Sequence, residues 1–144
     1  MLVHHILASK ASAAVLTIAP TASLADAAKV LSDKRIGSLV VSADGRHADG
    51  ILSERDIVRE IGRRGAGCLA DPVSAVMTRG VVTCSRAATA DQVLQTMTDG
   101  RFRHLPVIED GVLIGLVSIG DVVKARLSQL AMENDALEGM IKGF

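Results

Sequence analysis

Short apolar runs alternate with amphipathic segments along this chain, and the alternation occurs twice. Residues 15–18, 38–42 and 105–108 are rich in apolar, β-branched residues and predict short buried strands. Segments with apolar residues at helical spacing accompany these runs; their apolar positions are Leu24, Ala27, Ala28 and Leu31 in the first copy and Val93, Leu94 and Met97 in the second. The pattern therefore predicts α/β units.

Cap and turn signals mark where these elements begin and end. Ser23 and Thr89 are each followed three residues later by Asp or Gln, the spacing of a capping box at a helix start. Asp-Gly pairs at residues 44–45 and 110–111 predict turns that close hairpins with the glycine-led strand that follows. The second helix of each unit is predicted to begin at a serine, which is Ser53 in the first unit and Ser118 in the second.

The two copies match residue by residue. Residues 50–58 and 115–123 share one frame: glycine, two apolar residues, serine, two further residues, aspartate and two apolar residues. Three further matches fit the same repeat: Thr17 with Thr83, Arg35 with Arg101, and residues 3–7 with residues 73–77. A duplication over most of a short chain implies two similar units related by a pseudo-two-fold axis, with a pair of equivalent clefts.

The predicted fold class is α/β, with two tandem β-α-β-β-α units related by pseudo-two-fold symmetry and an extended C-terminal helix. We assign residues 1–64 to the first unit with its N-terminal segment and residues 73–128 to the second. Residues 65–72 lie in a stretch rich in Gly, Arg and Ala and are expected to form the linker. Residues 129–144 are expected to extend the last helix.

The last helix is predicted to run from Asp121 nearly to Phe144, because no proline interrupts this stretch. Six of its positions alternate at spacings of four and three residues, which is a heptad seam with one polar member: Val123, Leu127, Leu130, Asn134, Leu137 and Ile141. Such a seam packs on its own domain or pairs with a partner chain, and the pattern leaves both open.

Composition narrows the classes of function. The 144 residues are 49% hydrophobic and contain no Trp, no Tyr and two Phe, so the core must be aliphatic. The lack of aromatic stacking platforms argues against binding of single-stranded nucleic acid. Sixteen basic and sixteen acidic residues leave no net charge to attract nucleic acid or an anionic membrane. We therefore expect neither as a partner.

The chain is expected to be cytoplasmic. Residues 11–27 resemble a signal peptide in their small and apolar residues, but the segment has little positive charge before it and overlaps the repeat. Cys68 and Cys84 are isolated from each other and lack C-x-x-C spacing, so we interpret them as reduced thiols. Cys84 lies next to Thr83, and a small buried hydrophobic role is favoured over redox sensing.

A single Ser-x-x-Asp at a helix start is most often a cap. Two copies, each following a glycine-led strand, give the chain a resemblance to the cystathionine-β-synthase (CBS) domain family. The matching pattern is a Thr, a helix, an apolar strand, an Asp-Gly turn, and then Gly-h-h-[Ser/Thr]-x-x-Asp-h-h, where h is apolar. It covers residues 15–64 and 81–128 and is similar to a stand-alone tandem CBS pair.

The resemblance implies a module that senses adenine nucleotides in clefts between its repeats. In the family the motif aspartate binds the ribose hydroxyls and the Ser or Thr lies near the phosphates. AMP, ADP or ATP is the implied ligand, with NAD(H) as a variant because it contains an AMP moiety. S-adenosylmethionine is less favoured, because arginines near the clefts suit phosphates. No metal is expected.

The family's clefts are composite, so residues of both repeats carry over to each. Cleft one would use Ser53, Arg55, Asp56, Thr83, Phe102, Arg103 and His104. Cleft two would use Thr17, Ile36, Gly37, Ser38, Ser118 and Asp121. Cleft one has Arg55 and Arg103 where cleft two has Gly120 and Gly37, so cleft one is expected to bind phosphorylated ligands better.

The sequence predicts a regulatory binding module that acts through a homodimer on an unknown downstream protein. No Ser-His-Asp or Cys-His pattern and no metal-ligand set is found outside the cleft residues, so we expect no enzymatic activity. The alternative is a dimerising scaffold that binds no nucleotide. The heptad seam favours the scaffold, whereas the Ser and Asp kept in both motifs favour the sensor.

Overall fold

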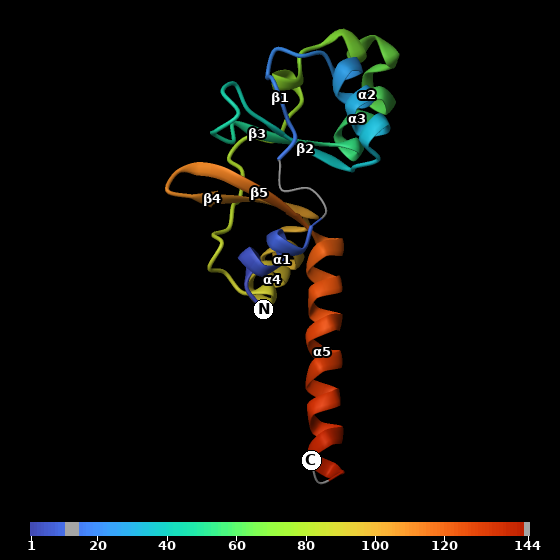
Figure 1. Ribbon diagram of the computed structural model, residues 1–144. Coiled ribbons are helices and arrows are strands. Elements are labelled where there is room, and N and C mark those ends of the chain that lie inside the picture. Colours follow the sequence, from blue (N-terminus) through green and yellow to red (C-terminus); the bar gives the residue numbers. More distant parts are fainter. Residues whose placement is uncertain (11–14, 143–144) are drawn as a thin grey trace.

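The duplicated pattern folds into two α/β halves, each with a small sheet and flanking helices (Figure 1). The computed structural model describes residues 1–10 and 15–142. The first half consists of β1 (Thr17–Ile18), α2 (Leu24–Lys34), β2 (Ser38–Val41), β3 (Gly50–Ser53) and α3 (Glu54–Arg64). The second consists of α4 (Ala90–Gly100), β4 (His104–Glu109), β5 (Val112–Ser118) and α5 (Ile119–Ile141). Helix α1 (Val3–Ser9) and the 3-10 helices η1 (Ala66–Ala70) and η2 (Val73–Ala75) complete the described elements.

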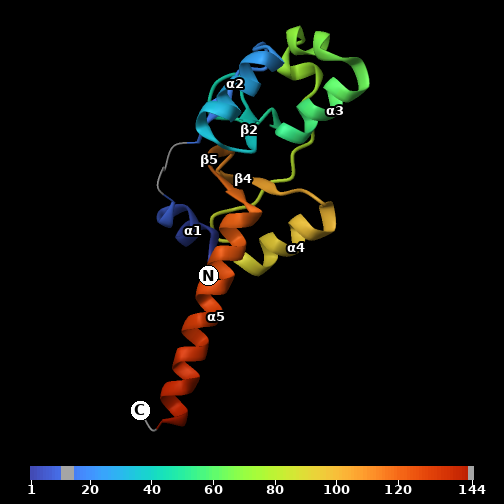
Figure 2. The same ribbon diagram turned by 90° about the vertical axis from the view of Figure 1, so that its right-hand side faces the viewer.

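The sheet of the first half has three strands in the order β1-β2-β3. Strand β2 runs parallel to β1 and antiparallel to β3. All four residues of β2 are buried: Ser38 and the three apolar residues that follow it, whose run predicts a buried strand. The two sheets lie side by side in the middle of the molecule, with α2 and α3 beyond one and α1 and α4 beyond the other (Figures 1 and 2).

The second half lacks a full counterpart of β1. Its sheet is the antiparallel pair β4-β5. An isolated parallel bridge between Cys84 and Val107 links one further segment to β4. The Cys84 N–H donates to the carbonyl of Pro106, and Ile108 donates back to Cys84. Pro106 has no N–H, so β4 cannot donate a hydrogen bond from this position to the segment before Cys84. The first strand predicted for the second half is therefore reduced to one bridge.

The segment that precedes each half in sequence packs on the other half. The Val3 N–H donates to the Ala88 carbonyl at 2.9 Å, and the Val73 N–H donates to the Ala22 carbonyl at 2.7 Å. Helix α1 thus lies against the second half, and η2 lies against the first. Each half is therefore contacted by the segment that leads into the other half. These two segments, residues 3–7 and 73–77, match each other in sequence.

The exchange divides the buried residues into two aliphatic cores. The first is formed by Ile18, Leu24, Ala27, Leu31, Leu39, Val41, Leu52, Ile57, Val73 and Met77. The second is formed by Val3, Ile6, Ala90, Val93, Met97, Leu105, Val107, Val117, Val122 and Ala125. Each core therefore takes two apolar residues from the exchanged segment.

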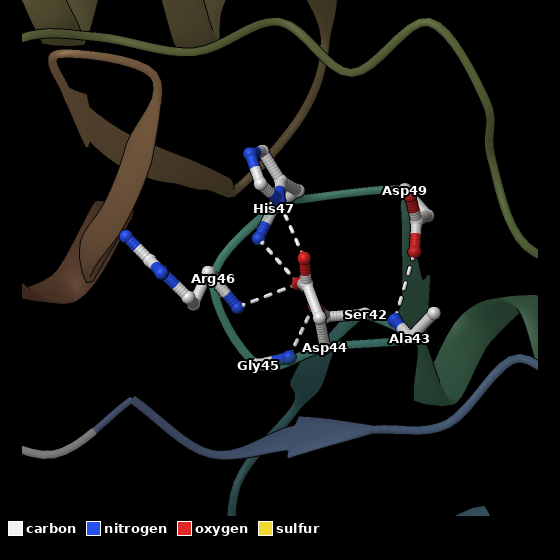
Figure 3. Close-up of polar contacts among 7 residues, drawn as sticks. All are labelled: Ser42, Ala43, Asp44, Gly45, Arg46, His47 and Asp49. Carbon is white, nitrogen blue, oxygen red and sulfur yellow. Dashed lines mark hydrogen bonds and ion pairs between the residues drawn. The ribbon is translucent and has the colours of Figure 1, made fainter.

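The loop between β2 and β3 is organised by one carboxylate (Figure 3). Asp44 accepts hydrogen bonds from the backbone N–H groups of Arg46 and His47 at 2.8 and 2.9 Å. The His47 ring, 2.6 Å from the carboxylate, and these two N–H groups hold the pKa of Asp44 well below its usual range. The Arg46 carbonyl accepts the Leu113 N–H at 2.7 Å, so this ordered loop also joins the two halves.

Helix α5 extends well beyond the rest of the fold (Figures 1 and 2). Val122 and Ala125, near its start, are buried in the second core, whereas the apolar seam is exposed. Leu127 is 62% exposed, Leu137 57% and Ile141 85%. Of the two interpretations left open by the sequence, packing of the seam on its own domain is therefore wrong. None of the described helices is long and apolar enough to cross a membrane.

Candidate functional site

Cleft one is a cavity of about 420 Å³ between the two halves, a size suited to a small molecule. Six of the residues predicted for this cleft line it: Ser53, Arg55, Asp56, Phe102, Arg103 and His104. The first three come from the start of α3, and the last three come from the segment that leads into β4. The composite arrangement therefore brings residues of both repeats into one cavity.

The start of α3 positions the motif serine and aspartate. Ser53 is the N-cap, and its hydroxyl accepts the Asp56 N–H at 3.2 Å. Asp56 Oδ2 accepts the Ser53 N–H at 2.8 Å, which completes a capping box. The other carboxylate oxygen, Oδ1, is 3.5 Å from the Arg59 guanidinium, a side chain that is 70% exposed. The capping structure thus keeps a partly accessible carboxylate at the wall of the cleft.

Arginines supply the positive charge of cleft one. Besides Arg55 and Arg103, the cavity is lined by Arg59 and Arg101, which the sequence analysis did not assign to it. Arg101 is the C-cap of α4 and has left-handed backbone angles, with φ of 58°. This conformation is unusual for a residue with a side chain. A phosphate in the cavity would meet guanidinium groups, which bind phosphate oxygens in pairs.

Cleft two is a cavity of about 960 Å³ at the motif of the second repeat. Five of the residues predicted for it line the cavity: Ile36, Gly37, Ser38, Ser118 and Asp121. Ser118 caps α5 and Asp121 completes the capping box, with distances of 3.1 and 2.9 Å. The two motifs are therefore built alike at the backbone.

The charge difference predicted between the clefts is smaller in the structure. Lys10, Lys34 and Arg35 also line cleft two, and none of them was in the sequence-based set. Arg35 caps α2 with φ of 53°, as Arg101 caps α4. The repeat match of Arg35 with Arg101 was the available signal for these two cap residues. Nothing local indicated Lys10, which reaches the cleft from α1.

Lys10 contacts the motif aspartate of cleft two. Its Nζ donates to Asp121 Oδ2 at 2.9 Å and to the Leu116 carbonyl at 2.8 Å. Burial alone would raise the pKa of Asp121, but the Ser118 N–H and the Lys10 ammonium together hold it below its ordinary value.

Ser38 and His104 line both clefts. The Ser38 side chain is 3% exposed overall, and its hydroxyl is buried without a hydrogen-bond partner. An unsatisfied buried hydroxyl is costly to the fold. Burial lowers the pKa of His104, an effect that Asp121 and Glu54 oppose. The imidazole is therefore favoured in its neutral form near pH 7.

Both predicted threonines lie outside the cavity linings. Thr17 lies in β1, paired with Val40, and Thr83 is exposed next to the Cys84 bridge. Burial raises the pKa of the Cys84 thiol to about 11, which makes it a poor nucleophile at neutral pH. Within the described ranges no group of three or more His, Cys, Asp or Glu side chains is arranged to hold a metal ion.

Comparisons with known proteins identify the repeat. The sequence profile of the CBS domain matches residues 7–63 and 73–128. The mitochondrial CBS domain-containing protein CBSX3 of Arabidopsis thaliana is 37% identical over 122 residues, which is 82% of this chain and 59% of that protein. The chain thus spans about three fifths of the length of this relative.

Solved structures share the fold. The CBS-domain containing protein ATU1752 from Agrobacterium tumefaciens superimposes with a TM-score of 0.82 at 46% identity, over 87% of this chain and 92% of that one. The CBS domain pair of protein MJ0100, solved with 5′-methylthioadenosine and S-adenosyl-L-methionine, superimposes with a TM-score of 0.77 at 25% identity, over 90% and 98% of the two chains. The predicted fold class of two CBS-type α/β units with a C-terminal helix is confirmed.

Proposed function

The chain belongs to the CBS domain family, and on that premise we propose that it is a regulatory module that binds an adenine nucleotide without catalysing a reaction. The observation that carries this proposal is cleft one, in which the Asp56 carboxylate and several arginines line one cavity. A carboxylate accepts hydrogen bonds from ribose hydroxyls, and guanidinium groups donate hydrogen bonds to phosphate oxygens. One ligand with both groups satisfies both features.

The arginines favour a phosphorylated ligand. We propose AMP, ADP or ATP, with NAD(H) as a variant that would place its AMP half in the same cleft. The structural relative MJ0100 was solved with adenosine compounds that carry no phosphate. S-adenosylmethionine is therefore the comparison ligand, and a cleft that prefers it over AMP would argue against a phosphate role for Arg55 and Arg103.

Calorimetry of nucleotide-stripped protein tests the function. AMP, ATP, NADH and S-adenosylmethionine are titrated into the wild-type chain and into Asp56→Asn and Asp121→Asn, which keep the shape of the cap. Hydrogen bonds to a charged group contribute about 1.5–3 kcal/mol, so Asp56→Asn should weaken AMP binding roughly 10- to 100-fold. Asp33→Asn, at an exposed position on α2, is the matched control.

We propose that Asp121→Asn has the smaller effect, because cleft one is the main site. Arg103→Ala should weaken AMP binding more than Arg86→Ala, an exposed arginine outside both linings. Absence of heat with every ligand would leave both Ser-x-x-Asp pairs as helix caps. The scaffold interpretation would then take first place.

We propose that the module acts as a homodimer through the exposed stripe of α5. The stripe is formed by the seam residues, whose five apolar members all exceed 40% exposure: Val123, Leu127, Leu130, Leu137 and Ile141. Met132 and Met140 are also exposed on this helix. An apolar stripe of this length favours burial against a second copy. A change in the dimer on ligand binding would carry the signal to a downstream protein.

We further propose a cytoplasmic location. Cys68 and Cys84 are both free, as expected in a compartment that keeps thiols reduced. Fractionation of cells that produce the full-length protein, with detection of its tagged form, tests this location.

A further inference from the structure

The motif aspartate of cleft two already has a cationic partner from its own chain. Asp121 Oδ2 accepts the Lys10 ammonium at 2.9 Å and the Ser118 N–H at 2.9 Å. The side chains of Lys10 and Asp121 are 32% and 25% exposed, so solvent screens this pair less than a fully exposed one. Under the proposed function, a ribose hydroxyl would have to donate to this carboxylate. Lys10 therefore holds one oxygen of the carboxylate that the ligand needs.

Among the described residues, no lysine lines cleft one. The register that matches residues 3–7 with residues 73–77 sets Gly80 against Lys10. The backbone contacts follow the same register, since Val3 and Val73 bond to equivalent carbonyls. Gly80 has no side chain that could reach Asp56. Both aspartates complete the same capping box. The cation nearest Asp56 is Arg59, 3.5 Å from Oδ1 with a side chain 70% exposed, whereas Lys10 is 2.9 Å from Asp121 Oδ2 with a side chain 32% exposed. Lys10 is therefore the closer and less exposed of the two partners.

The side chain of Lys10 can leave Asp121 without moving the fold. Lys10 is the C-cap of α1, which is anchored in the second core by Val3 and Ile6, 0% and 2% exposed. Its flexible four-carbon stem allows the ammonium to rotate away while the backbone stays in place. Displacement then costs the two hydrogen bonds that Nζ makes to Asp121 and Leu116.

We propose that Lys10 is an internal competitor for the ribose position of cleft two. A nucleoside binds this cleft only when its hydroxyls displace the Lys10 ammonium from Asp121, whereas cleft one accepts it directly. The proposal rests on the proposed function and deepens it, because it gives the physical reason why the two clefts differ in affinity. The difference comes from one lysine at the carboxylate rather than from the number of cations around each cleft.

Adenosine is the probe of choice, because it carries the ribose diol but no phosphate that a displaced lysine would attract. Calorimetry is done in an Asp56→Asn background, which weakens binding at cleft one. The measured heat then reports adenosine binding at cleft two. Adding Lys10→Met should tighten adenosine binding about tenfold, as expected when one charge-assisted hydrogen bond no longer has to be broken. Lys10→Gln should act in the same direction. Lys29→Met, at an exposed lysine of α2, should leave the affinity unchanged.

A ligand control separates the diol from the rest of the nucleoside. The affinity for 2′,3′-dideoxyadenosine should not change with Lys10→Met, since this compound has no hydroxyl for Asp121. A carboxyl-detected NMR titration should show that the pKa of Asp121 rises in Lys10→Met, which reports the ion pair in solution. Thermal melts of each variant verify that it is folded.

Two results overturn the proposal in distinguishable ways. If AMP binds the wild-type chain at cleft one but Lys10→Met leaves adenosine affinity at cleft two unchanged, Lys10 does not compete and the proposed function stands. If no variant binds AMP or adenosine at all, the proposed function itself fails, and the competitor proposal fails with it.

Discussion

Gly50 and Gly115 open the repeated motif at the two points where the exchanged segments come closest. A Cβ at Gly50 would lie 2.6 Å from the Met77 sulfur and 2.9 Å from the Thr78 carbonyl oxygen. A Cβ at Gly115 would lie 2.6 Å from a methyl carbon of Leu7. Leu7 and Met77 hold the same position in the two matching segments. Each glycine is thus required by a contact made across the repeats.

Gly50→Ala should therefore destabilise the protein. Because the Thr78 carbonyl belongs to backbone and cannot rotate away, the expected loss in free energy of unfolding is about 1–3 kcal/mol. Denaturant unfolding measures it. The control is Gly62→Ala in α3, where an added Cβ meets nothing within 4 Å and should stabilise by about 0.5–1 kcal/mol. Equal stability of the two variants would contradict this account.

Arg101 is held in a left-handed conformation at the mouth of cleft one, as Arg35 is at cleft two. Arg101→Gly should relieve this backbone conformation and raise the free energy of unfolding by up to about 1 kcal/mol. The same change should weaken AMP binding a few-fold, because a cation of the cleft is lost. Melting and calorimetry on one preparation test both effects. A variant that loses stability and keeps its affinity would show that Arg101 serves the fold rather than the ligand.

At the scale of elements, α5 combines two roles along its length. Its first turns carry the Ser118–Asp121 cap and bury Val122 and Ala125. Its later turns extend beyond the rest of the fold (Figure 2), and their seam residues are exposed. Helices in proteins are stabilised mostly by burial of an apolar face. The projecting turns of α5 have no such burial within one chain, which is the physical reason to expect a second copy.

Charge on the stripe should therefore separate the dimer. Replacing Leu127 and Leu137 with Glu is expected to convert a dimer into a monomer in sedimentation velocity, because two charged groups would be buried in the interface. Ser128→Glu, at an exposed position of the same helix, is the control and should leave the dimer intact. A wild-type chain that sediments as a monomer would refute pairing through α5.

At the scale of the whole molecule, the exchanged segments make each core depend on a part of the chain distant in sequence. Ile6 is 2% exposed in the second core, and Val73 is 0% exposed in the first. Two sequential folding units would not have this property. Each half should consequently lose stability when the leading segment of the other half is altered, because part of its core is removed.

Ile6 precedes the first half in sequence but packs in the second core, so Ile6→Ala should destabilise the second half. The expected loss is about 2–4 kcal/mol, as for other large buried aliphatic side chains. Hydrogen exchange should show the larger loss of protection in β4, β5 and α4, and Val73→Ala should show it first in β2 and α2. If Ile6→Ala instead exposed the amides of β2, the exchanged arrangement would be wrong.

Most of the fold was accessible from local signals in the sequence. Serine caps at Ser53 and Ser118, the Asp-Gly turns and the buried runs each depend on residues a few positions apart, so their pattern predicts them. The duplication indicated a pair of clefts, and the family resemblance supplied their composite make-up; most residues carried over from the family line the two cavities. The heptad spacing of the α5 seam was visible in the sequence, whereas its exposure to solvent was not.

Contacts between distant segments required the tertiary structure. No spacing rule sets Val3 against Ala88 or Val73 against Ala22, because either segment has the apolar residues to fill either core. The pair between Lys10 and Asp121 joins residues 111 positions apart, so no local pattern indicates it. The sequence by itself determined which elements form and which motifs repeat, since those follow from neighbouring residues. Only the assembled halves decided which cation meets which carboxylate, since that depends on how the two cores exchange their leading segments.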